Sequence, residues 1–327
     1  MEENLLLNEI EQPQNKISKF VDQIKDELHK VIVGQDPMID LMLAGLFSGG
    51  HILLEGVPGI AKTLTAKLIA KSLSVGFSRI QFTPDLMPAD ILGTSVFNIK
   101  TSEFTFNKGP IFSNIILIDE INRSPAKTQA ALFEVMEELQ ITADGTTYPM
   151  EFPFLVLATQ NPVEQEGTYK LPEAQLDRFL FKIKLNYPSL EEEMIILKRF
   201  KEDFTGRSIE NVQAVMSADD IRTCRAFVEK IHIKDELLDY IAKIVHTTRN
   251  NGDLFLGASP RASLAIMKSA KAIAAIRNRD FVTPDDIRFV SYPVLNHRII
   301  LTPEREMEGF ETEDIIKGII EGIEVPR

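Results

Sequence analysis

The chain has 327 residues, which is long enough for two domains with sizeable buried cores. Hydrophobic residues make up 44% of it and charged residues 26%, the composition of an ordinary globular protein rather than a disordered one. The net charge of −12 argues against a nucleic-acid-binding surface as the main functional feature, although an acidic chain can still carry a local basic channel.

The chain shows no sign of secretion or of a membrane span. Its one cysteine, Cys224, cannot form an internal disulfide, and the five histidines never fall at metal-ligand spacing, which argues against a zinc site. The longest charge-free apolar stretch, residues 41–54, is too short to cross a bilayer, and no signal segment precedes it. We therefore expect a cytoplasmic protein.

Two helices and then a strand are predicted in the first 55 residues. Residues 1–13 are acidic and have no periodic pattern, so we expect them to be disordered. From Lys16 the apolar residues recur at helical spacing, which predicts an amphipathic helix. A connector at 31–35 and a second helix at 37–47 follow, and the apolar run Ile52–Leu54 then predicts a strand.

The stretch from Gly56 to Thr63 follows that strand and precedes a helix predicted over 64–73. A strand, a Gly/Pro loop and a helix N-terminus in this order can bind phosphate, because backbone N–H groups and the helix dipole converge on an anion. Lys62 and Thr63 can then reach the outer phosphates and a Mg²⁺ ion. The usual pattern has glycine before the lysine, whereas this chain has Ala61, so the pattern alone fits an ordinary strand-to-helix turn equally well.

Further strands and helices alternate up to about residue 185. Apolar runs predict strands at 79–83, 114–118, 154–159 and 179–185, and helices are predicted at 84–92, broken by Pro88, and after Ser124-Pro125. Uncharged strands alternating with helices indicate an α/β fold with a five-stranded parallel sheet between helices. Two β-hairpins, at 96–106 and at 140–148 around Asp144-Gly145, interrupt this rhythm and are predicted to be insertions.

The pattern changes after Pro188, where no further strand is predicted. Five helical stretches follow, at 191–204, 219–231, 234–250, 260–279 and 284–295. We therefore predict a nucleotide-binding core over 14–188 and an all-helical second domain over 189–327.

Asp119 and Glu120 end the buried strand at 114–118. Ligands of open α/β sheets bind outside the carboxyl ends of the strands, where the phosphate loop and this acidic pair would meet. We expect Thr63 and Asp119 to bind Mg²⁺ and Glu120 to orient or deprotonate an attacking water. Two adjacent carboxylates could instead only cap the next helix, but the loop upstream favours the catalytic interpretation.

Three further polar residues are candidates for the same site. Asn161 follows the fourth strand and can hydrogen-bond the γ-phosphate or the attacking water, or serve only as a turn residue before Pro162. Arg178 either pairs with Asp177 or acts as an arginine finger on the nucleotide of a neighbouring subunit. Arg261, a cation at a helix N-terminus, suggests an anionic ligand across the domain cleft.

These residues together resemble the AAA+ ATPases, and within them the MoxR group, over residues 33–295. The matching motifs are Walker A at 56–63 including the Ala61 variant, Walker B at 116–120, sensor 1 at 158–162, the arginine-finger segment at 176–179 and sensor 2 at 258–261. The two hairpins resemble the helix-2 insert and the pre-sensor-1 insert of this clade.

The resemblance implies a ring, commonly a hexamer, that binds ATP or ADP with Mg²⁺ between subunits and moves a helical lid on hydrolysis. MoxR-group proteins are associated with chaperone-like maturation of protein complexes, often with a partner that carries a von Willebrand factor A domain. The residues expected to contact the nucleotide are Val33, Gly34 and Gln35 at the adenine, and Gly56, Val57, Pro58, Gly59, Ile60, Ala61, Lys62, Thr63 and Leu64 around the phosphates.

The leading hypothesis is therefore a Mg²⁺-dependent ATPase that remodels a protein partner. A nucleotide-gated scaffold or regulator is an alternative, against which Glu120 argues, because a pure switch needs no water-activating carboxylate. The net charge disfavours a DNA-dependent motor, and a small-molecule kinase would leave the arginine-finger segment without a role.

Overall fold

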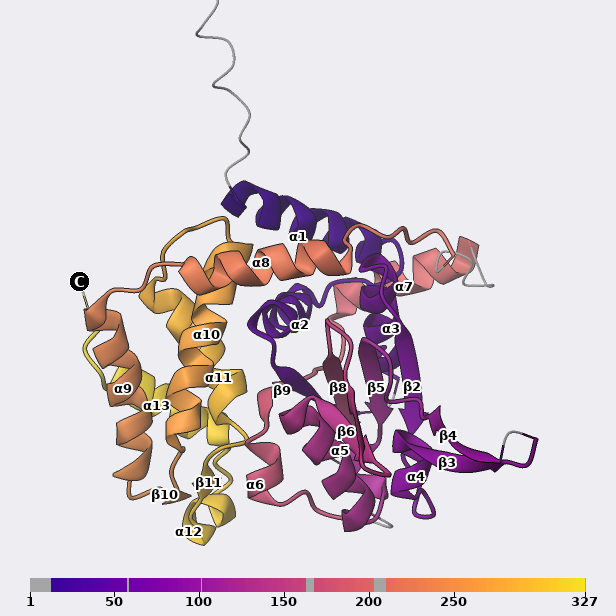
Figure 1. The fold of residues 1–327 in the computed structure, drawn as a ribbon. Helices are drawn as coiled ribbons and strands as arrows, with labels where there is room; N and C mark the ends of the chain where they lie inside the picture. Colours follow the sequence, from indigo (N-terminus) through magenta and orange to yellow (C-terminus); the bar gives the residue numbers. More distant parts are fainter. Residues whose placement is uncertain (1–12, 58, 101, 163–167, 203–209, 327) are drawn as a thin grey trace, which may run out of the picture.

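A five-stranded parallel sheet lies at the centre of the structure, a computed structural model that describes residues 13–57, 59–100, 102–162, 168–202 and 210–326 (Figure 1). The strand order is β2-β5-β8-β1-β9, so the first strand lies between the two that come last in the chain. The predicted α/β fold class is confirmed. The strands are β1 (His51–Glu55), β2 (Phe77–Gln81), β5 (Ile115–Asp119), β8 (Leu155–Gln160) and β9 (Phe179–Lys184).

Helices cover both faces of this sheet, and successive strand residues supply the two cores. Ile115 and Leu117 of β5 belong to the core beneath α2 (Asp36–Ser48) and α3 (Lys62–Ser72). Ile116 and Ile118 point the other way, into the core beneath α5 (Ala126–Glu138). Because side chains alternate across a strand, an uninterrupted apolar run is what a strand buried on both faces requires.

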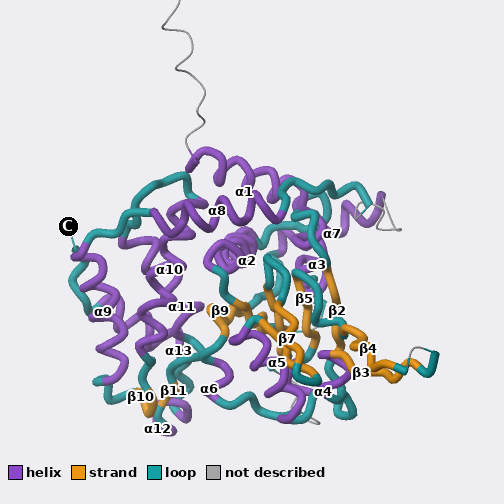
Figure 2. The backbone as a smooth tube through the Cα atoms, in the orientation of Figure 1, coloured by secondary structure: helices purple, strands orange, loops and turns teal. Residues whose placement is uncertain are grey.

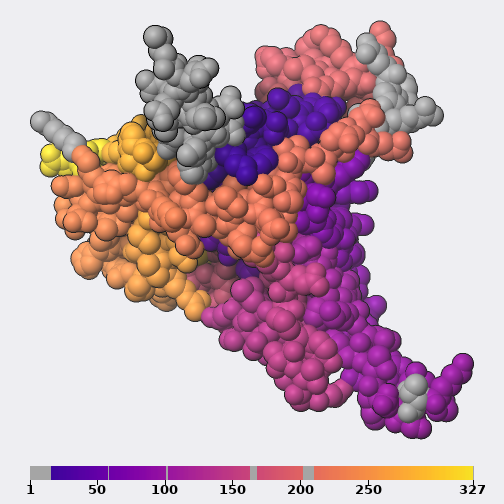
Figure 3. Space-filling view, turned by 45° about the horizontal axis from the view of Figure 1, so that its top comes forward, coloured from indigo at the N-terminus to yellow at the C-terminus, as the bar shows by residue number. Residues whose placement is uncertain are grey.

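Both predicted hairpins are present. The first follows α4 (Pro88–Leu92) and pairs β3 (Gly93–Asn98) with β4 (Glu103–Lys108), and it projects from the body of the molecule (Figures 1 and 3). The second pairs β6 (Gln140–Ala143) with β7 (Thr146–Pro149). Its turn residues Asp144 and Gly145 have φ of 49° and 76°, the pair of positive values that a type I′ turn needs. Thr101, in the first turn, lies outside the described residues.

The region after β9 is mainly helical, as Figure 2 shows. Ser259 and Thr283 cap their helices as the Ser-Pro and Thr-Pro signals predicted. The helices are α7 (Leu190–Glu202), α8 (Ala218–Lys230), α9 (Asp235–Arg249), α10 (Pro260–Ile276), α11 (Pro284–Leu295), α12 (Pro303–Met307) and α13 (Thr312–Glu321), of which the last two were not predicted.

The expectation that no strand follows residue 188 is wrong. β10 (Leu254–Leu256) and β11 (Ile300–Leu301) form a short antiparallel ladder within the helical region. Strands of three and two residues are too short to show an alternating pattern, and 43 residues separate their ends (300 − 257 = 43), so local sequence carries no signal for this pairing.

The helical region shares one apolar core with the sheet. α10 packs against α2, and α1 (Pro13–His29) packs against α3, α8 and α10. α1 begins at Pro13, three residues before the predicted start, and residues 1–12 of the segment expected to be disordered lie outside the described residues. The division into a core over 14–188 and a lid over 189–327 remains a prediction.

No helix within the described ranges is both long enough and apolar enough to cross a membrane.

His51, the first residue of β1, is buried and ties three elements together. Its Nδ1 accepts a hydrogen bond from the Val156 N–H at 3.0 Å, and its Nε2 lies 3.1 Å from the carbonyl oxygen of Met136 near the end of α5. These contacts assign the neutral ring with the proton on Nε2. Burial lowers the pKa of His51 to about 4, because the charged ring would lose its hydration.

We expect the free energy of unfolding to fall as the pH drops from 6.5 to 4. The unfolded imidazole takes up a proton near pH 6.5, whereas folded His51 stays neutral until about pH 4, so protons bind preferentially to the unfolded chain. Protonation linked to His51 should lower the free energy of unfolding by about 3 kcal/mol between pH 6.5 and pH 4. Urea unfolding at several pH values measures the effect. His51→Gln should show a shallower pH dependence than the exposed-site control His246→Gln, and equal slopes would contradict the assignment.

Candidate active site

The loop between β1 and α3 is held in one shape by glycine and by a bond to a neighbouring strand. A Cβ on Gly56 would lie 2.5 Å from the Cδ1 of Ile60 and 3.1 Å from the carbonyl oxygen of Leu185, so a larger residue would require its neighbours to shift. The Gly56 N–H donates to the carbonyl oxygen of Gln160 at 3.3 Å, which fixes the loop to the end of β8. Gly59 and Ala61 have φ of 89° and 60°, so the chain turns sharply before α3 begins. Pro58 lies outside the described residues.

Lys62, Thr63 and Leu64 form the first turn of α3, and the Lys62 ammonium donates to the carbonyl oxygen of Gly56. The lysine therefore folds back over its own loop. Unpaired N–H groups of a helix N-terminus and an ammonium group placed together favour binding of a polyphosphate.

The predicted adenine segment borders this loop. Gln35 Nε2 donates to the carbonyl oxygen of Ile60 at 3.5 Å, so the connector before α2 lies beside the loop that follows β1. Gly34, which follows Val33, has a φ of 64°, and a Cβ there would lie 1.8 Å from Oε1 of Glu192 on α7. The structure thus brings a third chain segment, α7, to the predicted nucleotide site.

Asp119 lies at the end of β5 and faces the loop. Its Oδ1 is 3.4 Å from the Thr63 hydroxyl and 3.3 Å from the Thr159 hydroxyl, and the residue is 6% exposed. Mg²⁺ binds oxygen ligands, and hydroxyl and carboxylate oxygens beside a phosphate site can serve as such ligands together with water and phosphate oxygens. Thr63 and Asp119 therefore fit the predicted metal-binding role.

Glu120 follows at once and is held in an unusual backbone conformation, with a φ of 57°. A left-handed conformation at a residue with a side chain is energetically costly and persists only where its surroundings enforce it. The Glu120 N–H donates to the Thr159 hydroxyl at 3.0 Å. Its carboxylate accepts from Gln81 Nε2 at 2.7 Å and lies 3.1 Å from Arg123 Nε, so both backbone and side chain are oriented.

Two residues of the edge strand β2 were missed by sequence reasoning. Gln81 contacts Glu120, and the Arg79 guanidinium lies 2.6 Å from Oδ2 of Asp119. Arg79 and Gln81 are two positions apart and therefore share one face of β2, and Gln81 pairs with Asp119 across the ladder. The alternation of these two polar residues with Ile80 at the end of a strand was the available signal in the sequence. Only the pairing of β2 with β5 shows that this polar face lies beside Asp119 and Glu120.

Asn161 also lies at this edge. It follows β8, is 7% exposed, and comes directly after Gln160, whose carbonyl oxygen holds the phosphate loop. The structure therefore brings together the phosphate loop, Asp119, Glu120 and Asn161, as predicted from the sequence.

Arg178 and Arg261 lie elsewhere. Arg178 precedes β9, which runs parallel to β1 with Phe179 beside His51, so it lies at the amino edge of the sheet. The phosphate loop follows Glu55 at the carboxyl edge, one strand length or about 16 Å away. Arg178 donates to the Phe133 carbonyl oxygen at 3.0 Å and forms an ion pair with Glu137.

Arg261 joins the same carboxylate. Its Nη2 lies 3.1 Å from Oε1 of Glu137, which brings the helical region against the end of α5. The alternative in which Arg178 pairs with Asp177 is not realised, because Asp177 instead accepts from Arg298 at 2.7 Å and from the Ser259 hydroxyl at 3.2 Å.

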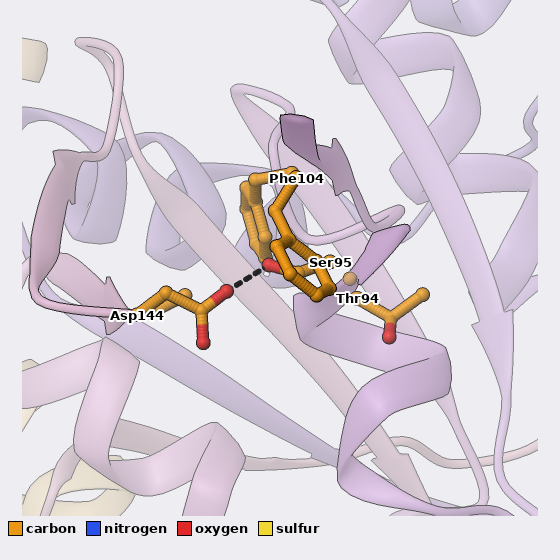
Figure 4. A pocket seen from close by; sticks show the side chains of 7 residues that line it. Thr94, Ser95, Phe104 and Asp144 are labelled. Carbon is orange, nitrogen blue, oxygen red and sulfur yellow. Dashed lines mark hydrogen bonds between the residues drawn. The ribbon is translucent and has the colours of Figure 1, made fainter. Parts of the chain in front are cut away.

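A separate hollow of about 660 Å³ lies between the two hairpins. Its lining includes Thr94, Ser95 and Phe104 of the first hairpin and Asp144 of the second, and the Ser95 hydroxyl donates to the Asp144 carboxylate (Figure 4). None of the phosphate-loop residues described above lines it, so it is distinct from the candidate active site.

Comparison with known proteins agrees with this geometry. Residues 51–181 match the model of the ATPase family associated with various cellular activities, and residues 246–319 match that of the AAA lid domain. The chain is 44% identical over 313 residues to the uncharacterized protein YeaC of Bacillus subtilis, covering 96% of this chain and 97% of that protein. It is 44% identical over 310 residues to Chaperone MoxR1 of Mycobacterium tuberculosis, covering 92% and 81%. The crystal structure of a candidate ATPase from Cytophaga hutchinsonii is similar with a TM-score of 0.88 and 46% identity, covering 96% and 97%.

The positive φ of Ala61 leads to a stability prediction. An alanine in the left-handed region costs about 1 kcal/mol that glycine avoids. We expect Ala61→Gly to raise the free energy of unfolding by up to about 1 kcal/mol, measured by urea denaturation. The control Ala66→Gly, in the interior of α3, should lower it by about 1 kcal/mol or more. If both substitutions destabilise the protein equally, Ala61 is not strained.

Proposed function

The chain belongs to the MoxR group of the AAA+ ATPases, and from this premise we propose that it hydrolyses ATP in a Mg²⁺-dependent reaction to remodel a protein partner. The observation that carries the proposal is the contact of the Thr63 hydroxyl with Asp119 beside the phosphate loop, with the backbone of Glu120 linked to Asp119 through the Thr159 hydroxyl. Hydrolysis needs a polyphosphate cradle, oxygen ligands for a divalent cation and a carboxylate for water, and these residues supply each of them.

Each residue then has a defined task. The loop N–H groups and Lys62 bind the β- and γ-phosphates. Thr63 and Asp119 would hold the cation, which would supply positive charge beside the phosphate oxygens. Glu120 orients the attacking water and accepts its proton, while Gln81 and Arg123 keep the carboxylate in place. Asn161 is positioned to hydrogen-bond the γ-phosphate or that water.

AAA+ proteins typically form oligomeric rings, and the position of Arg178 supports such an assembly here. A guanidinium at the amino edge of the sheet cannot reach the phosphate loop of its own chain without a large rearrangement. In a head-to-tail ring it would instead face the loop of the next copy, where it could stabilise charge that develops on the γ-phosphate. A hexamer is the ring size that we propose.

The first hairpin supports contact with a partner. It carries exposed apolar side chains, with Ile99 85% and Phe104 72% accessible to solvent, alongside Val96 and Phe97. Exposed apolar groups clustered on a projecting hairpin are a typical feature of protein-binding surfaces. A protein with a von Willebrand factor A domain is the partner class that we propose, by analogy with the MoxR group.

Replacing Glu120 by Gln should abolish turnover and preserve ATP binding. The amide cannot accept a proton from water but keeps the size of the side chain, so we expect the ATP hydrolysis rate to fall by about 10² to 10⁴-fold. Phosphate release measures turnover, and a fluorescent ATP analogue measures binding. Glu103→Gln, on the exposed β4, is the matched control.

Unchanged turnover in Glu120→Gln would remove the proposed role of this carboxylate. If the unmodified protein binds ATP without hydrolysing it, the nucleotide-gated regulator becomes the better account. Stimulation of hydrolysis by single- or double-stranded DNA would favour the motor.

A further inference from the structure

Two arginines from distant parts of the chain converge on the carboxylate of Glu137. Arg178 precedes β9 in the sheet domain and Arg261 lies in the first turn of α10 in the helical region. Each contacts a different oxygen of Glu137, Arg178 at Oε2 and Arg261 at Oε1. Glu137 thus sets the position of both cations relative to one another.

The carboxylate is itself well fixed. Glu137 lies in the last turn of α5, and that turn is attached to the sheet by His51, whose Nε2 lies 3.1 Å from the Met136 carbonyl oxygen. Arg178 also donates to the carbonyl oxygen of Phe133, one turn earlier on the same helix. The arginine pair is therefore mounted on a rigid helix end rather than on a flexible loop.

The two arginines share one carboxylate at this junction. Arg298 and Asp177 neutralise each other, with 2.7 Å between Nε and Oδ1, whereas Arg178 and Arg261 share the single negative charge of Glu137. The side chains of Arg261 and Glu137 are 56% and 40% exposed, so an anion can approach them. A phosphate group is suited to this place, because guanidinium groups bind phosphate oxygens through paired N–H donors.

We propose that Glu137 is a positioning residue that holds Arg178 and Arg261 as a preformed pair for the terminal phosphate of ATP bound to a neighbouring copy of this chain. The inference rests on the proposed ATPase function and adds to it a residue outside the motifs that predicted that function. Long arginine side chains lose rotamer freedom when they bind a phosphate. A fixed carboxylate between them orders both side chains before binding and so reduces this entropic cost.

The experiment compares Glu137→Gln with Glu138→Gln in the full chain. Glu138 is the next residue of α5 and is exposed, and its side chain forms no hydrogen bond or ion pair with another described residue, so the control removes the same charge from the same helix end. Glu137→Asp keeps the charge on a side chain one carbon shorter and tests for partial recovery. Size-exclusion chromatography and thermal unfolding of every variant report on assembly and folding.

The decisive readout is nucleotide affinity in the hydrolysis-deficient Glu120→Gln background. Only ATP carries the phosphate that the arginine pair would contact, so Glu137→Gln should weaken ATP binding about fivefold to tenfold and change ADP binding less than twofold. With Glu120 intact, kcat should fall by about tenfold or more, and KM for ATP should rise by a factor similar to the loss of ATP affinity. Glu138→Gln should match the parent protein in both measurements.

Three results would overturn the proposal: an unchanged ratio of ATP to ADP affinity, an equal effect from Glu138→Gln, or parallel losses of assembly, melting temperature and both affinities. The last would make Glu137 a structural brace between sheet and lid. If the unmodified protein shows no turnover, the ATPase proposal fails, while a selective loss of ATP affinity in Glu137→Gln would still support the positioning role.

Discussion

The parallel register between β1 and β9 determines where the functional groups of this protein can lie. Because the strands run side by side in the same direction, the loop after Glu55 and the arginine before Phe179 occupy opposite edges of the sheet. β5 and β8 share that direction, so Asp119, Glu120 and Asn161 must join the loop at the carboxyl edge. The residues at the carboxyl edge are thereby gathered in one chain, and Arg178 is separated from them by the length of a strand.

The carboxyl edge is held together by polar contacts that do not depend on a bound ligand. Thr159 links the Asp119 carboxylate to the backbone of Glu120, and Gln81 and Arg79 reach the two acids from the edge strand. The left-handed backbone of Glu120 is retained because these contacts surround it. The phosphate site is thus largely preorganised, which lowers the cost of ordering it around a nucleotide.

The junction between sheet and lid combines two kinds of contact. The packing of α10 on α2 is apolar and continuous with the main core, whereas Asp177, Glu137 and their partners form a charged contact at the amino edge. Apolar packing is non-directional, and the Arg298 side chain that pairs with Asp177 is only 3% exposed, whereas the ion pair of Arg261 with Glu137 is exposed to solvent and therefore weak. A lid that moves during turnover would exchange the contact of Arg261 with Glu137 more readily than its apolar contacts.

The sequence was sufficient for the fold class. The polar residues that it predicted at the carboxyl edge lie there, because a phosphate-binding motif places its residues in one contiguous loop and at one strand end, and their roles remain predictions. Arg79 and Gln81 were missed because their contacts depend on the pairing of β2 with β5, which no local pattern specifies. Glu137 was missed for a similar reason, since it is one of three exposed acidic residues on α5 and only the folded chain brings arginines to it. The β10–β11 ladder was missed because its strands are too short for periodicity to appear.

The central claim is that one copy supplies the phosphate loop and Glu120 while the next supplies Arg178. It is tested most directly by mixing copies that carry Glu120→Gln with copies that carry Arg178→Ala, each inactive alone under this account. In an equimolar random ring, one interface in four joins an intact Glu120 to an intact Arg178, so the mixture should regain about one quarter of the unmodified hydrolysis rate. A mixture that stays as inactive as its two components, or an Arg178→Ala protein that is fully active alone, would contradict the divided site.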